Sequence, residues 1–128
     1  MIRGMILINE NPICAMFDTG ASHSFISDSC AEKLHLRVDE LSYDVCVSSP
    51  MGAKVVTHKT CLNCVIQYEQ LSDTTDLICL PFKGIDVIMG LSWLTANNVL
   101  IDCGNKTLVV IMGLSWLTAN NVLIYYSS

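Results

Sequence analysis

Charged residues are scarce in this sequence: they make up 15% of its 128 residues, whereas 52% are hydrophobic. The seven lysines and arginines are scattered along the chain and form no cluster. A nucleic-acid-binding surface needs a clustered basic footprint, so nucleic acid is not an expected partner. The apolar content argues against wholesale disorder, and the length suits one packed domain.

Long hydrophobic runs and nucleotide-binding motifs are also missing. No run reaches the roughly 18–20 apolar residues of a membrane helix, so no membrane partner is expected. The apolar stretch over residues 1–8 is too short for a signal peptide, and no small-residue cleavage site follows it. The sequence contains no G-x-x-x-x-G-K or G-x-G-x-x-G pattern, and we expect no cofactor. With an odd count of seven cysteines, these absences favour a reducing, cytoplasmic setting in which most cysteines pack as small core hydrophobes.

What the sequence does contain is a series of short apolar runs, rich in β-branched residues and separated by turn residues about every ten positions. This pattern is typical of an all-β barrel or sandwich. Strands are predicted at residues 4–8, 13–17, 42–48, 53–61, 61–69 and 75–81. The run over 13–17 is apolar on both faces and indicates a central strand. In the alternating run over 42–48, Tyr43, Val45 and Val47 are expected on one face.

Two segments break the strand pattern. Residues 28–36 predict one or two helical turns with Asp28 as N-cap. Near the C-terminus, a strand ending in Ile88-Met89-Gly90 leads into one short helix over residues 91–96, which Asn97-Asn98 ends. The runs over 99–103 and 106–110, joined by a turn at Gly104-Asn105, then predict a closing hairpin.

The last part of the chain repeats an earlier part. The sequence VIMGLSWLTANNVLI occurs at residues 87–101 and again, identical at every position, at 110–124. Genuine structural repeats usually come in three or more copies, so two perfect copies indicate a recent tandem duplication or a sequence-assembly error. We therefore expect one domain over residues 1–110. Residues 111–128 form a duplicated tail that copies residues 88–101 and is not a separate domain.

The stretch FDTGASHSFIS at residues 17–27, followed by DVIMGLSWL at 86–94 and VLIDC at 99–103, resembles a retropepsin-like aspartic protease. More narrowly, it resembles the protease domain of gypsy-type LTR retrotransposon polyproteins. The resemblance covers residues 2 to about 110. It implies a single-lobe acid-protease β-barrel that is active as a homodimer.

The resemblance also assigns roles to individual residues. Asp18 matches the catalytic aspartate, and Thr19 matches the threonine whose hydroxyl helps to lock two active-site loops together. Gly20 matches the glycine that lets the backbone approach substrate, and Ala21-Ser22 completes the active-site loop. The remaining matched positions form the second loop beneath the site (Ile88, Met89, Gly90) and the substrate-contacting flap (Ser49, Pro50, Met51, Gly52).

The chemistry requires a second carboxylate. Peptide hydrolysis by this route uses two carboxylates about 3 Å apart that share one proton, so that one activates a water and the other protonates the carbonyl oxygen. The chain has one D-T-G, so the dyad must pair Asp18 with Asp18 of a second copy on a two-fold axis. The expected activity is aspartic endopeptidase cleavage of an extended peptide or polyprotein substrate.

Other interpretations remain open. The domain is alternatively an inactive retropepsin-like module for dimerisation or peptide binding, or a degenerate element fragment, because the tail can compete with the first copy for its place. A zinc site at His58-x-x-Cys61-x-x-Cys64 is weaker, since a fourth ligand is missing and no metal is expected. Ser22 and His23 are only sequence neighbours, which is not the geometry of a catalytic triad. Trp93 and Leu94 are expected in the core.

Overall fold

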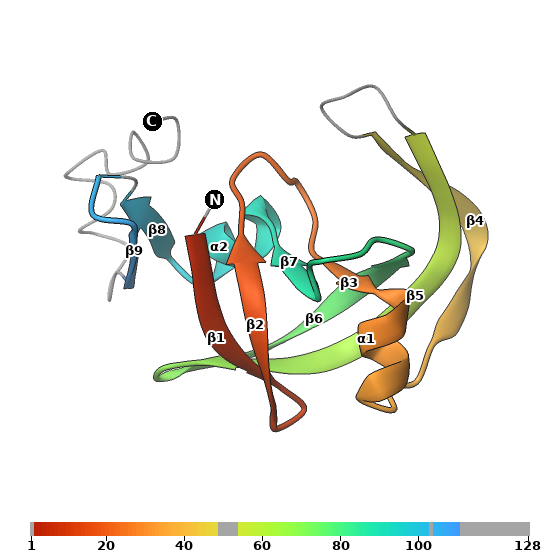
Figure 1. The fold of residues 1–128 in the computed structure, drawn as a ribbon, viewed down its shortest axis with the longest axis horizontal. Helices are drawn as coiled ribbons and strands as arrows, with labels where there is room; N and C mark the ends of the chain where they lie inside the picture. Colours follow the sequence, from red (N-terminus) through yellow and green to blue (C-terminus); the bar gives the residue numbers. More distant parts are fainter. Residues whose placement is uncertain (1, 49–53, 103, 111–128) are drawn as a thin grey trace.

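The structure, a computed structural model, describes residues 2–48, 54–102 and 104–110. Within these residues the chain forms nine strands and two short helices (Figure 1). The elements are β1 (Ile2–Ile8), β2 (Asn11–Phe17), β3 (Phe25–Ser27), α1 (Asp28–Lys33), β4 (Asp39–Ser48), β5 (Lys54–Tyr68), β6 (Leu71–Leu80), β7 (Val87–Met89), α2 (Leu91–Ala96), β8 (Val99–Asp102) and β9 (Thr107–Val110).

The strands close into a barrel. One sheet has the order β1-β2-β7-β3-β6-β5-β4, and β1 also pairs with β5 through Leu7–Gln67 and Ile8–Ile66. This extra pairing joins six strands into a ring and leaves β4 outside it. The predicted all-β class is therefore confirmed, and of the two architectures that the sequence left open the molecule has the barrel. The short helix predicted near the C-terminus is α2.

The barrel interior holds the core. Phe17 is fully buried, and its ring centroid lies 5.6 Å from that of Tyr68 and 5.9 Å from that of Trp93. Trp93 and Leu94 on α2 are buried, as expected for core residues. Four of the six described cysteines, Cys30, Cys61, Cys64 and Cys79, are buried free thiols, which agrees with their predicted packing role.

β2 lies between β1 and β7, which agrees with the prediction of a central strand, although Cys14 on it is exposed. The turn before it is shorter than predicted. Asn9 and Glu10 alone make it, with φ of 46° and 71°, and β2 already begins at Asn11. Pro12 fits inside the strand because its fixed φ is compatible with extended backbone.

The predicted N-cap of α1 is wrong. Ser27 caps the helix, since its hydroxyl oxygen accepts a hydrogen bond of 3.1 Å from the Cys30 amide, and Asp28 lies in the first turn. The helix also ends at Lys33, earlier than the predicted limit of residue 36. His35 takes a left-handed conformation with φ of 54°, which stops the helix there.

Two predicted strands, over 53–61 and 61–69, are one strand. β5 runs without interruption from Lys54 to Tyr68 and curves along the barrel (Figure 1). The break in the sequence pattern corresponds to a register shift against β6 between Cys61 and Cys64, where Asn63 has φ of 53°. The break in the apolar pattern near residue 61, which predicted the end of a strand, is therefore a β-bulge within one strand.

The predicted alternation of side chains between the two faces of β4 is found only near the C-terminal end of the strand. Val45 and Val47 are half-buried as expected, but Tyr43 is 64% exposed. The β4–β5 register shifts between Glu40 and Val45, so Tyr43 lies in a bulge and does not follow the face of the two valines.

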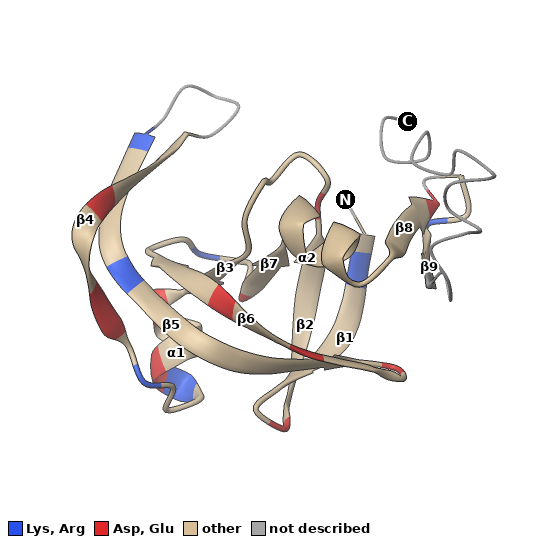
Figure 2. Ribbon diagram, turned by 180° about the vertical axis from the view of Figure 1, so that it is seen from behind, with Lys and Arg blue, Asp and Glu red and all other residues tan. Residues whose placement is uncertain are grey.

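The basic residues of the described ranges do not gather in one place. Lys and Arg appear as isolated bands spread over the described ribbon (Figure 2). Neither of the two helices in the described ranges is long and apolar enough to span a membrane.

Candidate active site

The centre of the candidate site is the loop that leaves β2. β2 pairs in parallel with β7, so that Phe17 lies opposite Met89, and the Asp18 amide donates a 3.0 Å hydrogen bond to the Met89 carbonyl. One residue after the buried Phe17, the chain emerges and presents the half-buried Asp18. The Asp18 carbonyl accepts from the Ala21 amide at 3.2 Å, which closes the turn.

Gly20 holds the Asp18 carboxylate. The Gly20 amide donates to Asp18 Oδ1 at 2.8 Å, and a Cβ at position 20 would lie 3.1 Å from that same oxygen. A side chain at this position would therefore crowd the carboxylate that the backbone amide binds. The preference for glycine here comes from this close contact and not from a left-handed backbone angle.

The loop rests on the junction between β7 and α2. The first two amides of α2 donate to loop carbonyls, Leu91 to Ala21 at 2.7 Å and Ser92 to Ser22 at 3.1 Å. These bonds satisfy amides that a helix leaves without an internal partner. They also fix the position of the loop that carries Asp18.

Gly90 lies against the backbone of the loop that carries Asp18. Its amide donates to the buried hydroxyl of Ser24 at 3.0 Å. A Cβ on Gly90 would lie 2.1 Å from the carbonyl oxygen of His23 and 2.7 Å from that of Ala21. Both obstacles are backbone atoms, so no side chain fits unless the loop moves away.

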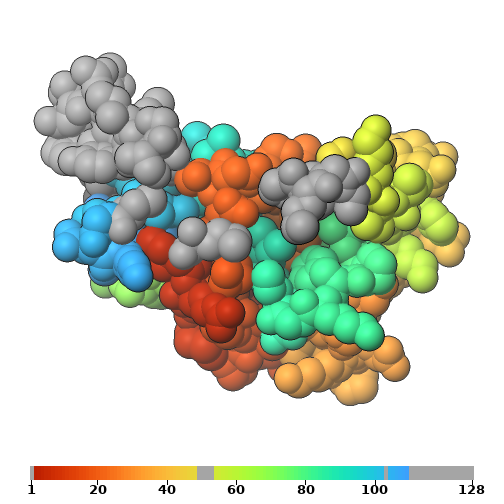
Figure 3. Space-filling view, turned by 45° about the horizontal axis from the view of Figure 1, so that its top comes forward, coloured from red at the N-terminus to blue at the C-terminus, as the bar shows by residue number. Residues whose placement is uncertain are grey.

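A cleft of about 540 Å³ opens between this loop and the arm formed by β4 and β5. The arm and the segment that follows β2 lie on the same face of the molecule (Figure 3). Asp18 is the only acidic residue among the described residues that line the cleft. The other lining residues are Gly20, Ala21, Ser22, His23, Phe25, Val45, Cys46, Val47, Ser48, Ile78, Leu80 and Ile88.

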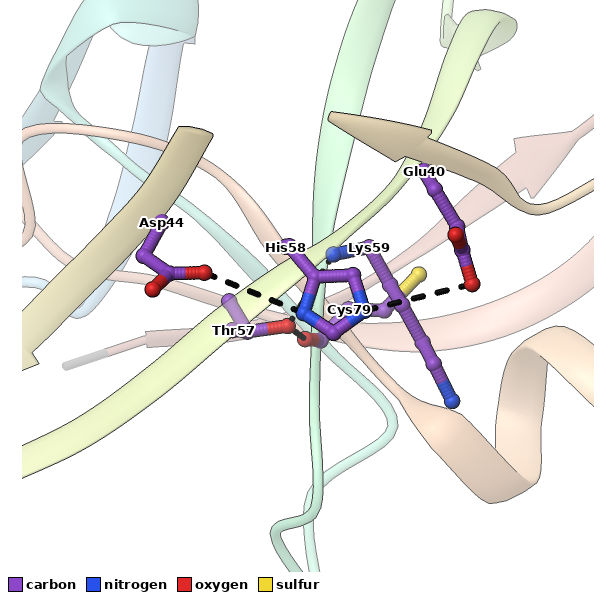
Figure 4. Close-up of polar contacts among 6 residues, drawn as sticks. All are labelled: Glu40, Asp44, Thr57, His58, Lys59 and Cys79. Atoms are coloured by element: carbon purple, nitrogen blue, oxygen red, sulfur yellow. Dashed lines mark hydrogen bonds and ion pairs between the residues drawn. The ribbon is translucent and has the colours of Figure 1, made fainter. Parts of the chain in front are cut away.

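The pairing between the two strands of the arm is interrupted at one place. β4 pairs with β5 at Glu40–Lys59 and again at Val45–Thr57, so residues 41–44 face His58 alone. The two ring nitrogens of His58 each lie 3.9 Å from a carboxylate oxygen, one of Glu40 and one of Asp44, on either side of this bulge (Figure 4). Below it, the buried Thr57 hydroxyl donates to the Cys79 carbonyl at 2.9 Å and ties the arm to β6.

A second hollow of about 380 Å³ adjoins the cleft, and His23, Val45 and Ile78 line both. Sequence reasoning treated Ser22 and His23 as mere neighbours, but Ser22 Oγ and His23 Nδ1 lie 2.8 Å apart. Both residues are exposed at the rim. This contact restrains the imidazole on the wall that separates the two hollows.

The structure brings most of the predicted site residues together. Asp18, Gly20, Ala21 and Ser22 line the cleft, and the half-buried Thr19 lies between them in the loop. Of the second loop, Ile88 reaches the cleft wall, whereas Met89 and Gly90 are buried. The flap tip predicted at Ser49, Pro50, Met51 and Gly52 lies outside the described residues.

Sequence reasoning missed the apolar walls of the cleft: Phe25, Val45, Val47, Ile78 and Leu80. The alternation of β4 was the one available signal, because it placed Val45 and Val47 on one face of the strand. The contributions of β3 and β6 depend on long-range strand pairing, which local patterns do not reveal. Ser24 was missed for the same reason, since its partner Gly90 lies 66 positions away.

The structure does not assemble the zinc ligands considered from the sequence. Cys61 and Cys64 are buried, whereas His58 is exposed and contacts carboxylates of β4. In residues 2–48, 54–102 and 104–110, no three His, Cys, Asp or Glu side chains are grouped to hold a metal ion. Cys61 Sγ instead lies 3.5 Å from Cys79 Sγ. A hydrogen bond with Cys64 raises the pKa of Cys61 to about 11, and a hydrogen bond with Cys61 raises the pKa of Cys79.

Comparisons with known proteins agree with this geometry. The model of the family described as retroviral aspartyl protease matches residues 1–110. The structure is similar to the retroviral protease-like domain of Ddi1 from Leishmania major, with TM-score 0.60, 18% identity, and coverage of 86% of this chain and 85% of that domain. It is also similar to the EIAV protease in complex with the inhibitor HBY-793, with TM-score 0.62, 19% identity, and coverage of 73% and 85%. A comparison with curated proteins finds no match. At these identities the two structures support a shared fold alone.

Proposed function

This chain belongs to the retroviral aspartyl protease family, and from that premise we propose that it is an aspartic endopeptidase that acts as a homodimer. The observation that carries the proposal is the placement of Asp18. Its carboxylate is held by the Gly20 amide at the end of a buried strand and lines an open cleft with apolar walls. Hydrolysis needs two carboxylates, and this cleft supplies one among its described lining residues. A second copy of the chain is the source of the other.

In the proposed mechanism the two Asp18 carboxylates share one proton. Two negative charges so close cannot both persist, so one carboxyl group stays protonated while the other is ionised. The ionised group takes a proton from a water molecule as the water oxygen attacks the carbonyl carbon, and the protonated group donates its proton to the carbonyl oxygen. The C–N bond then breaks: the carboxyl group that took the proton from water gives it to the leaving amine, and the other carboxylate takes a proton back from a hydroxyl of the intermediate. The Gly20 amide keeps the carboxylate oriented throughout.

The substrate is an extended peptide. It lies between the Asp18 loop and the β4–β5 arm, and main-chain hydrogen bonds hold it in the manner of an added strand. The apolar walls formed by Val45, Val47 and Ile78 favour apolar side chains next to the scissile bond. We further propose that the natural substrate is the polyprotein of a gypsy-type LTR retrotransposon, cleaved in the cytoplasm. The free thiols support a reducing compartment.

The test is cleavage of a peptide derived from the polyprotein by the wild type, Asp18→Asn and Asp28→Asn. Asp28 is exposed on α1 and lines neither the cleft nor the hollow beside it, so Asp28→Asn is the matched control for loss of one carboxylate. We expect Asp18→Asn to lose activity by at least about 10²- to 10⁴-fold, the range for loss of general acid–base catalysis, while the control keeps wild-type rates. Cleavage by Asp18→Asn at the wild-type rate would refute the mechanism.

The alternative is a retropepsin-like module without activity. The similarity to a domain from Leishmania major supports it, because the fold is then not confined to viral enzymes. Sedimentation and cleavage together separate the two functions. A dimer that cleaves the peptide favours the enzyme, whereas a dimer without cleavage, a monomer or an aggregate favours the inactive module. If residues 111–128 prevent dimerisation, their deletion restores the dimer.

A further inference from the structure

Residues 87–101 fill a slot in the body of the domain. They comprise β7, α2 and β8, and they close the barrel between β2 and β3 while supporting the Asp18 loop. More than half of the segment is buried: Val87, Met89, Gly90, Trp93, Leu94, Val99, Leu100 and Ile101. The slot is therefore highly selective for this sequence, and Gly90 is its strictest position because backbone atoms leave no room for a Cβ.

The same chain carries a second segment with the sequence that the slot requires. Residues 110–124 are identical to residues 87–101 at all 15 positions, and Gly113 takes the place of Gly90. Every side chain that packs in the slot is thus available twice, and the backbone hydrogen bonds to β2, β3 and the Asp18 loop can be made by either segment. The pairing of β8 with β9 is the exception, because Val110 of β9 is the first residue of the second copy. This pairing and the connections to the rest of the chain therefore distinguish the two segments.

We propose that residues 110–124 are an alternative occupant of this slot and exchange with residues 87–101 of the same chain. The exchange leaves the Asp18 loop resting on an identical sequence, with Leu114 and Ser115 in the places of Leu91 and Ser92. It releases residues 87–109, and with them the β8–β9 hairpin. The inference does not depend on catalytic activity.

Two observations explain why the structure has the first copy in the slot. The connection from β6 to the slot is six residues, 81 to 86, for the first copy and 29 residues, 81 to 109, for the second. Loop closure scales as about the 3/2 power of length, so the longer loop disfavours the second copy by about tenfold. Moreover, the Asp102 carboxylate accepts from the Gly104 and Asn105 amides in the turn after β8, whereas Tyr125 follows the second copy.

A defect confined to the first copy will reverse this preference, because it leaves the second occupant unaffected. Gly90→Val provides the defect, since the new side chain meets the carbonyl oxygens of Ala21 and His23. Gly113→Val is the matched control, because it introduces the same change in the second copy. The double variant has no intact occupant.

The experiment is thermal unfolding and hydrogen exchange with mass spectrometry on these three full-length variants and the wild type. Peptides that extend into Asp102 or into Tyr125 identify the two copies despite their identical sequence. We expect the wild type and Gly113→Val to protect residues 87–101. Gly90→Val should unfold cooperatively at a lower temperature and protect residues 110–124, and the double variant should lose the transition.

Three results would overturn the proposal. In the first, Gly90→Val is as unfolded as the double variant, which means that the second copy cannot fill the slot. In the second, Gly90→Val is folded but still protects residues 87–101, which means that the slot accepts valine. In the third, sedimentation over a range of concentrations finds folded Gly90→Val only in oligomers, so that the occupant comes from another chain.

Discussion

Ser24 offers the most direct test of how the Asp18 loop is held. Its hydroxyl is buried, with 2% of the residue exposed, and accepts the Gly90 amide at 3.0 Å. Ser24→Ala removes this acceptor and leaves a buried N–H without a partner. The desolvation cost of such a group is about 1–3 kcal/mol. For a chain of this length, about 4 °C of melting temperature corresponds to each kcal/mol, so a decrease of roughly 4–12 °C is expected.

Ser22→Ala is the matched control for Ser24→Ala. It removes a hydroxyl two positions earlier in the same loop, but Ser22 is exposed and its hydroxyl contacts only the His23 ring in the described structure. Exposed substitutions of this kind change stability by about 0.5 kcal/mol or less. Both variants should be melted at one fixed protein concentration, because the proposed dimerisation would make the transition concentration-dependent. Equal melting temperatures for the two variants would refute the claim that the Ser24–Gly90 bond stabilises the loop.

Two further predictions concern titratable groups. Brief alkylation of the native protein with iodoacetamide at neutral pH should label the exposed Cys14 and Cys46 first. Cys30, Cys61 and Cys79 should react later, because they are buried and their raised pKa values keep the thiols protonated. Equal labelling of the exposed and buried cysteines would contradict this prediction. Hydrogen bonds from the Asn105 side chain and from backbone amides lower the pKa of Asp102 in the folded protein. The ionised carboxylate therefore stabilises the fold fully at pH values above the pKa of an unfolded aspartate, near 4. This stabilisation is lost as the pH falls through the lower pKa that Asp102 has in the folded protein. Melting curves between about pH 6 and pH 2.5 should therefore show a larger acid loss for the wild type than for Asp102→Asn, and parallel curves would exclude this role.

The sequence was sufficient to predict the elements whose signals are local. The apolar run before Asp18 and the turn at Asp18-Thr19-Gly20 predicted a carboxylate at a strand end, and the structure has it there. The strand, glycine and short helix over residues 87–96 were also predicted, since their apolar pattern and the Asn97-Asn98 stop are contiguous. The resemblance to retropepsins added the fold, which strand spacing alone left open between barrel and sandwich.

What the sequence could not predict depends on pairing between distant segments. β5 was divided in two because a bulge looks like a strand end when the partner strand is unknown. Tyr43 was placed with Val45 because strict alternation assumes a regular ladder, and the ladder shifts there. The walls of the cleft come from β3, β4 and β6, which the order of strands in the sheet brings together and the order in the chain does not.

The parallel pairing of β2 with β7 has a consequence for the time at which the site forms during synthesis. Met89 follows Phe17 by 72 residues, so translation at about 5–20 residues per second supplies it about 4–14 s later. Until then the Asp18 loop lacks the Met89 carbonyl, the Gly90 amide and the first turn of α2. A nascent chain therefore carries the Asp18-Thr19-Gly20 sequence long before it has the residues that support this loop. If the protein cleaves the polyprotein from which it is made, this delay protects the growing chain from premature cleavage by itself.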